Sequence, residues 1–360
     1  MAPLASFQSG ILAPPKKSPG RPAGGWLRHS GLRLSSGLGL VALLVGCSPK
    51  PPAATDTSPG KTRVVVQLDW IPEPEHGGFF QAQARGWFAA AGLEVELLPG
   101  GANTFGPQKV ATSQAHIGQA DSTTTLLAIA EGLPLVHVGA VFQNDPSVLM
   151  LHADNPVTRF EDLDGKTLMA RPEWVFLGYL KQKYKVTVNV IPQNFQVGNF
   201  IADKDFIQQG FYIAEPFHII RGGAQPPKFL YVWDAGFDAY TALYANRAWT
   251  RDHGQQLRAF LSAYAAGWRD YLQGDPAPGQ VALKVANPNN TDDFLAWSRQ
   301  KIIDERLVGG RDASPAGDLT RAGRIEASRF AVQIATLEEL GLVSPGKLTP
   351  DTVMTTEFLP

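Results

Sequence analysis

The chain of 360 residues contains a single cysteine, Cys47, so it cannot form an internal disulfide or a metal cluster of several cysteines. It also lacks any run of basic residues interleaved with aromatic side chains, which argues against a nucleic-acid partner. The whole chain has 32 basic and 33 acidic residues. Five of the basic residues and none of the acidic ones precede Cys47, so the remainder is mildly acidic, with 27 basic against 33 acidic residues.

A long hydrophobic run is absent as well. The apolar stretch of residues 37–45 is too short to span a bilayer, which takes roughly 20 apolar residues. Because basic residues precede it, the stretch is typical of the h-region of a signal peptide. The first residues, about 30 of them, are long for an n-region and suggest a start codon assigned too far upstream.

The apolar stretch closes with Leu44, Val45, Gly46 and Cys47, which resemble the lipobox of bacterial lipoproteins. This resemblance implies that residues 1–46 are a lipoprotein signal peptide and that Cys47 becomes the acylated first residue of the mature protein. An incidental cysteine after an apolar run is the alternative. The polar, proline-rich residues 47–62 are typical of a flexible tether between a membrane and a folded body.

From Arg63 onward, strand and helix patterns alternate. The β-branched run "RVVVQL", a helix from Phe79 to Phe88 and the strand "LEVELL" predict a parallel strand–helix–strand unit. The alternation continues and predicts α/β architecture with doubly wound sheets. The chain would then form two α/β lobes and pass twice between them, and these two crossings would act as a hinge around a ligand cleft. We expect lobe 1 in residues 63–150 and 240–345, with a mostly helical C-terminal part, lobe 2 in residues 151–239, and a tail in residues 346–360.

Four segments carry a resemblance to a known family: "LDWIPEPEHGGFFQAQARGWFAAAGLEVEL", "AHIGQADSTTTLLAIAEGLPLVHVGAVFQNDPSVLML", "FEDLDGKTLMA" and "QQGFYIAEPF". They resemble solute-binding proteins of ABC importers, in the branch that binds thiamine pyrimidine precursors, riboflavin, alkanesulfonates, taurine and nitrate. The resemblance implies a type II periplasmic-binding-protein fold, with a small-molecule ligand held between two lobes. It also implies delivery to a permease driven by a separate ATPase, and a monomer without cofactor, metal or catalysis.

In lobe 1, the first strand ends at Asp69 and Trp70, where open α/β sheets place their ligands. Family members that bind flat heterocycles stack aromatic rings from this loop on them, so the resemblance makes Trp70 the first ligand-binding candidate. A core tryptophan is the alternative. Asp69 and His76 would hydrogen-bond the ligand or only fix the loop.

Further candidates in lobe 1 come after the next strands of the predicted sheet. The glycines of "GGANTFG" allow close approach of a ligand, and "ADSTTT" begins a helix whose free amides favour a polar group. A plain turn and an ordinary helix cap are the alternatives. The candidates are Asn103, Thr104, Ser122, Thr123 and, before the hinge, Gln143.

In lobe 2, "ARPEW" supplies Arg171 and Trp174 at a helix start, and "AEPF" supplies Glu215. The family often has a Gly/Ser-rich anion-binding turn at the first position, so the bulkier residues here count against a sulfonate ligand. A carboxylate at Glu215 would accept hydrogen bonds from amino or imide groups and repel sulfonate or nitrate. Asp234 is a weaker candidate.

The sequence therefore predicts a lipid-anchored, extracytoplasmic binding protein for a pyrimidine or flavin-like heterocycle. A sulfonate, taurine or nitrate binder of the same fold is the alternative within the family. An enzyme resembling the eukaryotic thiamine-pyrimidine synthases is disfavoured, because those carry a cysteine-rich cluster in the body. A ligand-sensing lipoprotein without an importer is a third hypothesis.

Overall fold

The computed structural model describes residues 60–313 and 318–360. The predicted signal peptide, Cys47 and almost all of the tether lie outside these residues. None of the helices in the described part of the chain combines the length and apolar composition that a bilayer crossing needs.

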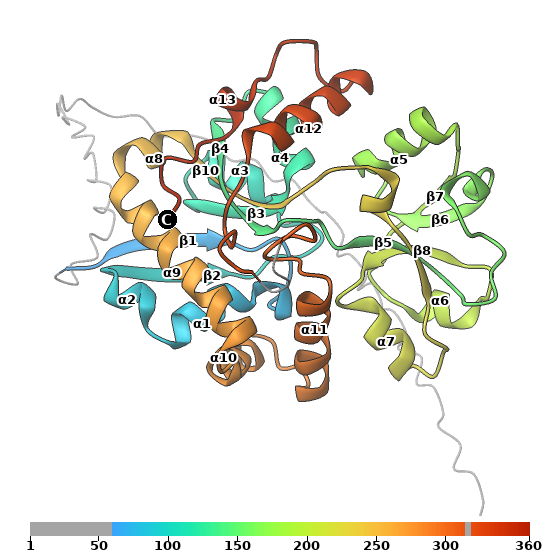
Figure 1. Ribbon diagram of the computed structural model, residues 1–360, viewed down its shortest axis with the longest axis horizontal. Coiled ribbons are helices and arrows are strands. Elements are labelled where there is room, and N and C mark those ends of the chain that lie inside the picture. Colours follow the sequence, from blue (N-terminus) through green and yellow to red (C-terminus); the bar gives the residue numbers. More distant parts are fainter. Residues whose placement is uncertain (1–59, 314–317) are drawn as a thin grey trace, which may run out of the picture. The chain divides into compact units, whose positions relative to one another are not determined.

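The first sheet is a mixed, five-stranded sheet at the centre of lobe 1 (Figure 1). Its first strands pair in parallel, and the strand that returns late in the chain lies antiparallel to both of its neighbours. All eight residues of "LVHVGAVF" are buried, although this strand lies at the edge of the sheet, because other parts of the chain cover it. In spatial order the strands are β2 (Leu93–Leu98), β1 (Thr62–Gln67), β3 (Ile117–Asp121), β10 (Thr241–Asn246) and β4 (Leu135–Phe142).

Short helices connect these strands. The predicted helix from Phe79 to Phe88 is divided into two helices, because Gly86 adopts a left-handed conformation with φ of 72°. The hydroxyl-rich start of the helix at Ser122 is confirmed. The elements are the 3₁₀ turn η1 (Pro74–His76), α1 (Gly77–Ala84), α2 (Trp87–Ala90), α3 (Gly106–Ala111) and α4 (Ser122–Ala130).

The second sheet, in lobe 2, has the same arrangement of strands as the first. Its first three strands in spatial order pair in parallel, and the fourth lies antiparallel to both of its neighbours. Its strands are β7 (Asn189–Pro192), β6 (Thr167–Ala170), β8 (Ile207–Phe211), β5 (Ser147–Leu151) and β9 (Lys228–Tyr231). Its helices and turns are η2 (Phe160–Leu163), α5 (Val175–Tyr179), η3 (Leu180–Tyr184), α6 (Gly198–Ala202), α7 (Glu215–Arg221) and η4 (Val232–Ala235).

The chain crosses between the sheets twice. The first crossing, residues 143–146, joins β4 to β5, and the second lies between η4 and β10. Since β5 pairs with β8 and β9, it belongs to lobe 2. The predicted boundary at residues 150 and 151 therefore lies a few residues too late, because the extended run "SVLML" is a sheet strand rather than an exit from lobe 1.

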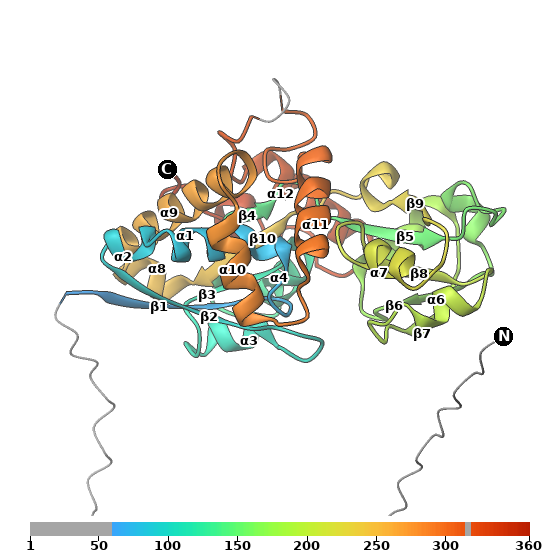
Figure 2. The ribbon, with the colours of Figure 1, turned by 90° about the horizontal axis from the view of Figure 1, so that it is seen from below.

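Helices of the C-terminal part cover lobe 1, and Figure 2 shows α9 beside α1. Gly267 of α9 permits this packing, since a Cβ there would lie 2.1 Å from the carbonyl oxygen of Gly78. The amphipathic run "QQLRAFLSAYAAGWRDYL" forms most of α9, as predicted. The helices are α8 (Arg247–Asp252), α9 (Gly254–Gln273), α10 (Ala277–Ala286), α11 (Asp292–Asp304), α12 (Ala327–Glu339) and α13 (Pro350–Val353).

The last residues are a structural element, although the sequence marks residues 346–360 only as a tail. Val353 is fully buried and Phe358 nearly so. The Nδ1 of His137, on β4, donates to the carbonyl of Val353 at 3.0 Å, and the N–H of Thr355 donates to the carbonyl of His137 at 3.0 Å. The C-terminal segment thereby covers β4 of the first sheet.

Candidate functional site

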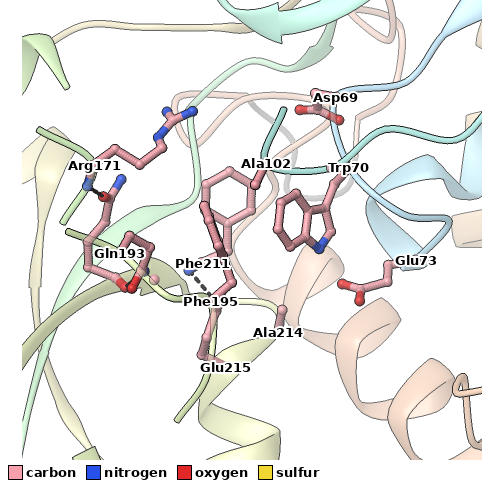
Figure 3. Close-up of a pocket in the computed structure, with 13 residues that line it drawn as sticks. Asp69, Trp70, Glu73, Ala102, Arg171, Gln193, Phe195, Phe211, Ala214 and Glu215 are labelled. Atoms are coloured by element: carbon pink, nitrogen blue, oxygen red, sulfur yellow. Dashed lines mark hydrogen bonds between the residues drawn. The ribbon is translucent and has the colours of Figure 1, made fainter. Parts of the chain in front are cut away.

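A cleft lies between the two lobes, with a cavity volume of about 140 Å³ (Figure 3). This volume is smaller than that of most small-molecule sites, roughly 300–1,000 Å³, so the cleft is narrow in this structure. Lobe 1 contributes Asp69, Trp70, Glu73, Gly101 and Ala102 to its lining. Lobe 2 contributes Arg171, Gln193, Phe195, Gln209, Gly210, Phe211, Ala214 and Glu215.

The lining residues lie at the carboxyl ends of parallel strands in both sheets. Asp69 and Trp70 come just after β1, and Arg171 comes just after β6. Gln193 and Phe195 come after β7, and Phe211 ends β8. Because open α/β sheets bind ligands outside the carboxyl ends of their strands, two such edges face one cleft.

Two aromatic rings meet across the cleft. Trp70 of lobe 1 and Phe195 of lobe 2 have ring centroids 4.8 Å apart with an interplanar angle of 40°. Phe195 has a φ of 59°, in the left-handed region that a bulky residue rarely adopts. Since backbone strain of this kind is frequent at ligand sites, the position of this ring points to function.

Both lobes contribute carboxyl groups to the cleft: Asp69 and Glu73 from lobe 1 and Glu215 from lobe 2. Burial, with the nearby charges of Glu215 and Asp69, raises the pKa of Glu73 to about 8. Burial also raises the pKa of Glu215, although the N–H of Phe211 donates to its Oε2 at 2.7 Å and opposes the shift. At neutral pH the Glu73 carboxyl can therefore donate a proton in a hydrogen bond as well as accept one.

His76 holds the loop after β1 from behind the cleft and is fully buried. Its Nδ1 accepts from the N–H of Glu73 at 3.2 Å, which places the ring proton on Nε2. Nε2 then donates to Oδ1 of Asp69 at 3.1 Å. His76 thus orients Asp69 and Glu73 and does not line the cleft itself.

Asp69, Glu75 and His76 are also the group that could hold a metal ion, since their ligand atoms lie within 4.8 Å of one another. The buried Oε1 of Glu75 has no hydrogen-bond partner within residues 60–313 and 318–360 and lies 3.5 Å from Nε2 of His76. A metal at Nε2 would need the proton on Nδ1, where the N–H of Glu73 already donates. The residues therefore do not fit a metal in this arrangement.

Arg171 is the basic residue that lines the cleft. Its backbone N–H donates to Oε1 of Gln209 at 3.0 Å, and Nε2 of Gln193 donates to the carbonyl of Gln209 at 2.8 Å. These bonds fix the end of β6 against β7 and β8. Within residues 60–313 and 318–360, the Arg171 guanidinium forms no ion pair.

Four of the predicted ligand-binding residues line this cleft: Asp69, Trp70, Arg171 and Glu215. Asn103 and Thr104 lie beside the lining residues Gly101 and Ala102, and the Thr104 hydroxyl donates to the Gly101 carbonyl at 2.7 Å. Their role stays a prediction.

The structure does not bring the remaining predicted residues to the cleft lining. The buried hydroxyl of Ser122 donates to Gln333, and Thr123 bonds the capping carboxylate of Asp121. The amide of Gln143 donates to the carbonyls of Arg321 and Arg324. The ring of Trp174 packs on Phe176 with centroids 4.9 Å apart, and Asp234 lies exposed in η4.

Several lining residues were not predicted from the sequence. Glu73 stands in "WIPEPEH", close after Trp70 in the chain, and its proximity to that candidate was an available signal. Gln193 and Phe195 come from a lobe 2 segment without a motif, whereas Gln209 and Phe211 stand in the family segment "QQGFYIAEPF", from which only Glu215 was a candidate. Only the folding of both sheets around one cleft brings them to the same site.

Comparison with known proteins identifies the family. The model of the family described as NMT1/THI5 like matches residues 73–277, more than half of the chain. The chain belongs to the NMT1/THI5-like family. The predicted relationship is thereby confirmed.

Two relatives match this NMT1/THI5-like chain over most of their own length. The riboflavin-binding protein RibY of Chloroflexus aurantiacus is 26% identical over 296 residues, 76% of this chain and 83% of the relative. The formylaminopyrimidine-binding protein of Halalkalibacterium halodurans is 25% identical over 277 residues, 74% of this chain and 82% of the relative.

Solved structures agree on the fold. The periplasmic aliphatic sulphonate binding protein SsuA of Escherichia coli superposes with a TM-score of 0.59 and 12% identity, covering 82% of this chain and 92% of that one. The NMT1/THI5-like chain therefore has the periplasmic-binding-protein fold, and the predicted fold class is confirmed.

Enzymes occur among the relatives of this NMT1/THI5-like chain as well. The 4-amino-5-hydroxymethyl-2-methylpyrimidine phosphate synthase of Uromyces fabae is 21% identical over 257 residues, 60% of this chain and 72% of the enzyme. Family membership by itself thus permits a binding protein or a synthase.

Proposed function

We propose that this chain is the substrate-binding component of an ABC importer and captures a small, flat, nitrogen-containing heterocycle, such as a pyrimidine or a flavin. It delivers that ligand unchanged to a membrane permease. Its lipid anchor is Cys47, which holds the body outside the cytoplasmic membrane. Loss of membrane association in Cys47→Ser tests the anchor separately.

The observation that carries this proposal is the pair of aromatic rings, Trp70 and Phe195, that face each other from two lobes. A planar ligand that entered between them would move the two tilted rings apart and stack on both, and the two lobes would then shield it from water. Stacking of a base on an aromatic side chain contributes about 1–3 kcal/mol by alanine substitution. The names of the riboflavin-binding and formylaminopyrimidine-binding relatives support a ligand of this shape.

The carboxyl groups support a nitrogen-rich ring over an inorganic or sulfonate anion. A carboxyl with a raised pKa donates to a ring nitrogen with one oxygen and accepts from an exocyclic amino group with the other. Glu73 and Glu215 line the cleft and have raised pKa values. Nitrate or a simple sulfonate has no amino group or ring nitrogen to meet these two carboxyl groups, which disfavours that alternative.

A binding role is also favoured over the synthase reaction. The chain has one cysteine, at position 47, and the match to the family begins at residue 73. A catalytic centre built on several thiols therefore has no place in the matched region. Turnover of a pyrimidine product by the purified protein is the result that would favour the enzyme.

The test is identification of the ligand itself. The protein is purified without added ligand, and the small molecules released on denaturation are identified by mass spectrometry. Calorimetry then compares 4-amino-5-hydroxymethyl-2-methylpyrimidine, its formylamino analogue and riboflavin with taurine and nitrate. We expect at least one heterocycle to bind in the micromolar range or tighter and both anions to fail. Binding of taurine or nitrate alone would overturn the proposal.

The presence of a permease and its ATPase distinguishes an importer component from a sensor that works without an importer. Permease and ATPase genes beside this one, and stimulation of that ATPase by the liganded protein, are expected for an importer. Absence of any effect on the ATPase would favour the sensor.

A further inference from the structure

The cleft contains one unpaired cation and several carboxyl groups, yet these do not neutralise each other. Asp69, Glu73 and Glu215 line the same cleft as Arg171, but none of them lies within ion-pair distance of its guanidinium. In Figure 3 the aromatic side chains separate Arg171 from Glu73. The positive charge of the cleft thus lies at one end and the carboxyl groups at the other, with flat apolar side chains between them.

The position of Arg171 is fixed by its neighbours. Its backbone N–H donates to Oε1 of Gln209, whose carbonyl accepts from Nε2 of Gln193. Both glutamines also line the cleft, and the buried Oε1 of Gln193 has no partner among the described residues. This end of the cleft thus offers a cation and a free acceptor for a hydroxyl hydrogen.

An unpaired guanidinium inside a closing cleft requires an anionic partner. Closure removes water from it, and a buried charge without a partner destabilises the closed state. A ligand anion satisfies the guanidinium through charge-assisted hydrogen bonds, which are the stronger class. The carboxyl groups at the other end would weaken the binding of a ligand that is anionic throughout.

We propose that the ligand has two different ends: an amino-heterocycle that meets Glu73 and Glu215, and an anionic substituent, such as a phosphate ester, a sulfonate or a carboxylate, that binds Arg171. The flat ring lies between Trp70 and Phe195. This assignment rests on the proposed function for the heterocycle and adds the anionic substituent and its receptor. Arg171 is then the residue that determines specificity between charged and uncharged forms of the same ring.

Matched pairs of compounds test the assignment by calorimetry on the protein. One pair is 4-amino-5-hydroxymethyl-2-methylpyrimidine and its monophosphate, and the other is riboflavin and flavin mononucleotide. We expect the phosphorylated member of at least one pair to bind about 10- to 100-fold more tightly, as a hydrogen-bonded charge pair provides. This preference should decrease as salt concentration rises.

Substitutions of Arg171 test whether the preference for the phosphorylated compound depends on this side chain. Arg171→Met should abolish the preference by weakening the phosphorylated member. The uncharged member should bind no more weakly than before, because closure no longer buries an unpaired guanidinium, and Arg171→Lys should retain part of the preference. Arg159→Met is the matched control, since Arg159 belongs to the same lobe, has 71% of its side chain exposed and lies outside the cleft lining. Thermal unfolding confirms that each variant is folded.

Equal affinity of the two members in the unmodified protein, or an equal loss of both in Arg171→Met, would overturn the assignment. A wrong assignment of the heterocycle gives a different result from a wrong assignment of the anion site. If no member of either pair binds, inorganic phosphate serves as the test anion. Stabilisation of the unmodified protein by phosphate, and not of Arg171→Met, would retain the anion site and reject the proposed heterocycle. No stabilisation would reject both.

Discussion

At the scale of single residues, Trp70 and Phe195 make the clearest pair, because each belongs to a different lobe and their rings are in contact. We predict that Trp70→Ala and Phe195→Ala each weaken binding of the identified heterocycle about 5- to 150-fold, since each removes one stacking face. Calorimetry measures the affinities. Trp87→Ala is the control, because Trp87 is a partly exposed tryptophan of lobe 1 outside the cleft.

The two substitutions also distinguish a ligand between the rings from one beside them. A sandwiched ligand requires both rings, so both variants should lose affinity. An unchanged affinity in Trp70→Ala would mean that the tryptophan only closes the cleft.

Glu73 predicts an unusual pH dependence of stability. Its pKa rises from 4.5 to about 8 on folding, so the folded protein binds this proton more tightly than the unfolded chain between these pH values. The free energy of unfolding should therefore fall as pH rises from 5.5 to 8. Glu73→Gln should reduce this fall by about 1–2 kcal/mol, because the side chain is partly open to water in the cleft.

Urea unfolding of the ligand-free protein at the two pH values measures this effect. Glu94→Gln is the control, because Glu94 is exposed on β2. A pH dependence that Glu73→Gln leaves unaltered would show that other groups are responsible, such as the buried Glu75, whose pKa burial also raises.

At this scale the sequence predicts which residues line the cleft only where they stand beside a recognisable strand end or within a family motif. Trp70, Asp69, Arg171 and Glu215 were candidates because each stands beside a strand or within a family motif, and all four line the cleft. Ser122 and Gln143 have equally suitable chemistry, but protein groups occupy their hydrogen bonds. Whether a polar side chain meets a ligand or its own fold depends on tertiary contacts, which periodicity does not contain.

At the scale of elements, the same limit applies to segments with weak patterns. The strands β1 and β2 are predicted by the runs "RVVVQL" and "LEVELL", and the structure has them where predicted. The C-terminal segment has no such pattern, because its stabilising contacts are made with β4, more than two hundred residues away. Its role as a structural cover could not be read from the sequence.

This segment should contribute measurably to stability. Val353 is fully buried under α12 and β4, so Val353→Ala should lower the free energy of unfolding by about 1–3 kcal/mol through lost burial and a residual cavity. Val332→Ala provides the same chemical change at a residue of α12 that is 53% exposed, and should cost little. Chemical denaturation compares the two, and equal values would show that the segment does not pack as described.

At the scale of the whole binding body, two sheets of identical strand order are connected by two crossings. Each sheet places its ligand-side loops at the same edge, so neither lobe alone holds a complete site. Lobe 1 supplies Trp70 and Glu73, and lobe 2 supplies Phe195 and Arg171. Binding and relative movement of the lobes are therefore coupled, as in hinge closure around a ligand.

The distance between the rings makes this coupling testable. At 4.8 Å the centroids of Trp70 and Phe195 leave no room for a ligand ring, which needs about 7 Å between the two rings, twice a contact distance of about 3.5 Å. Entry of the ligand must therefore separate the lobes by about 2 Å at the site. Positions farther from the hinge should move more.

Spin labels on the two lobes measure this movement. The chain has only Cys47, so Cys47→Ser with Glu94→Cys and Lys166→Cys provides one exposed label on each lobe. Double electron–electron resonance should give a distance distribution that shifts on saturation with the identified ligand. A pair within lobe 1, Glu94→Cys with Arg251→Cys, should not shift. An interlobe distance unaffected by saturating ligand would mean that the ligand binds without separating Trp70 from Phe195, and the stacking arrangement would then be wrong.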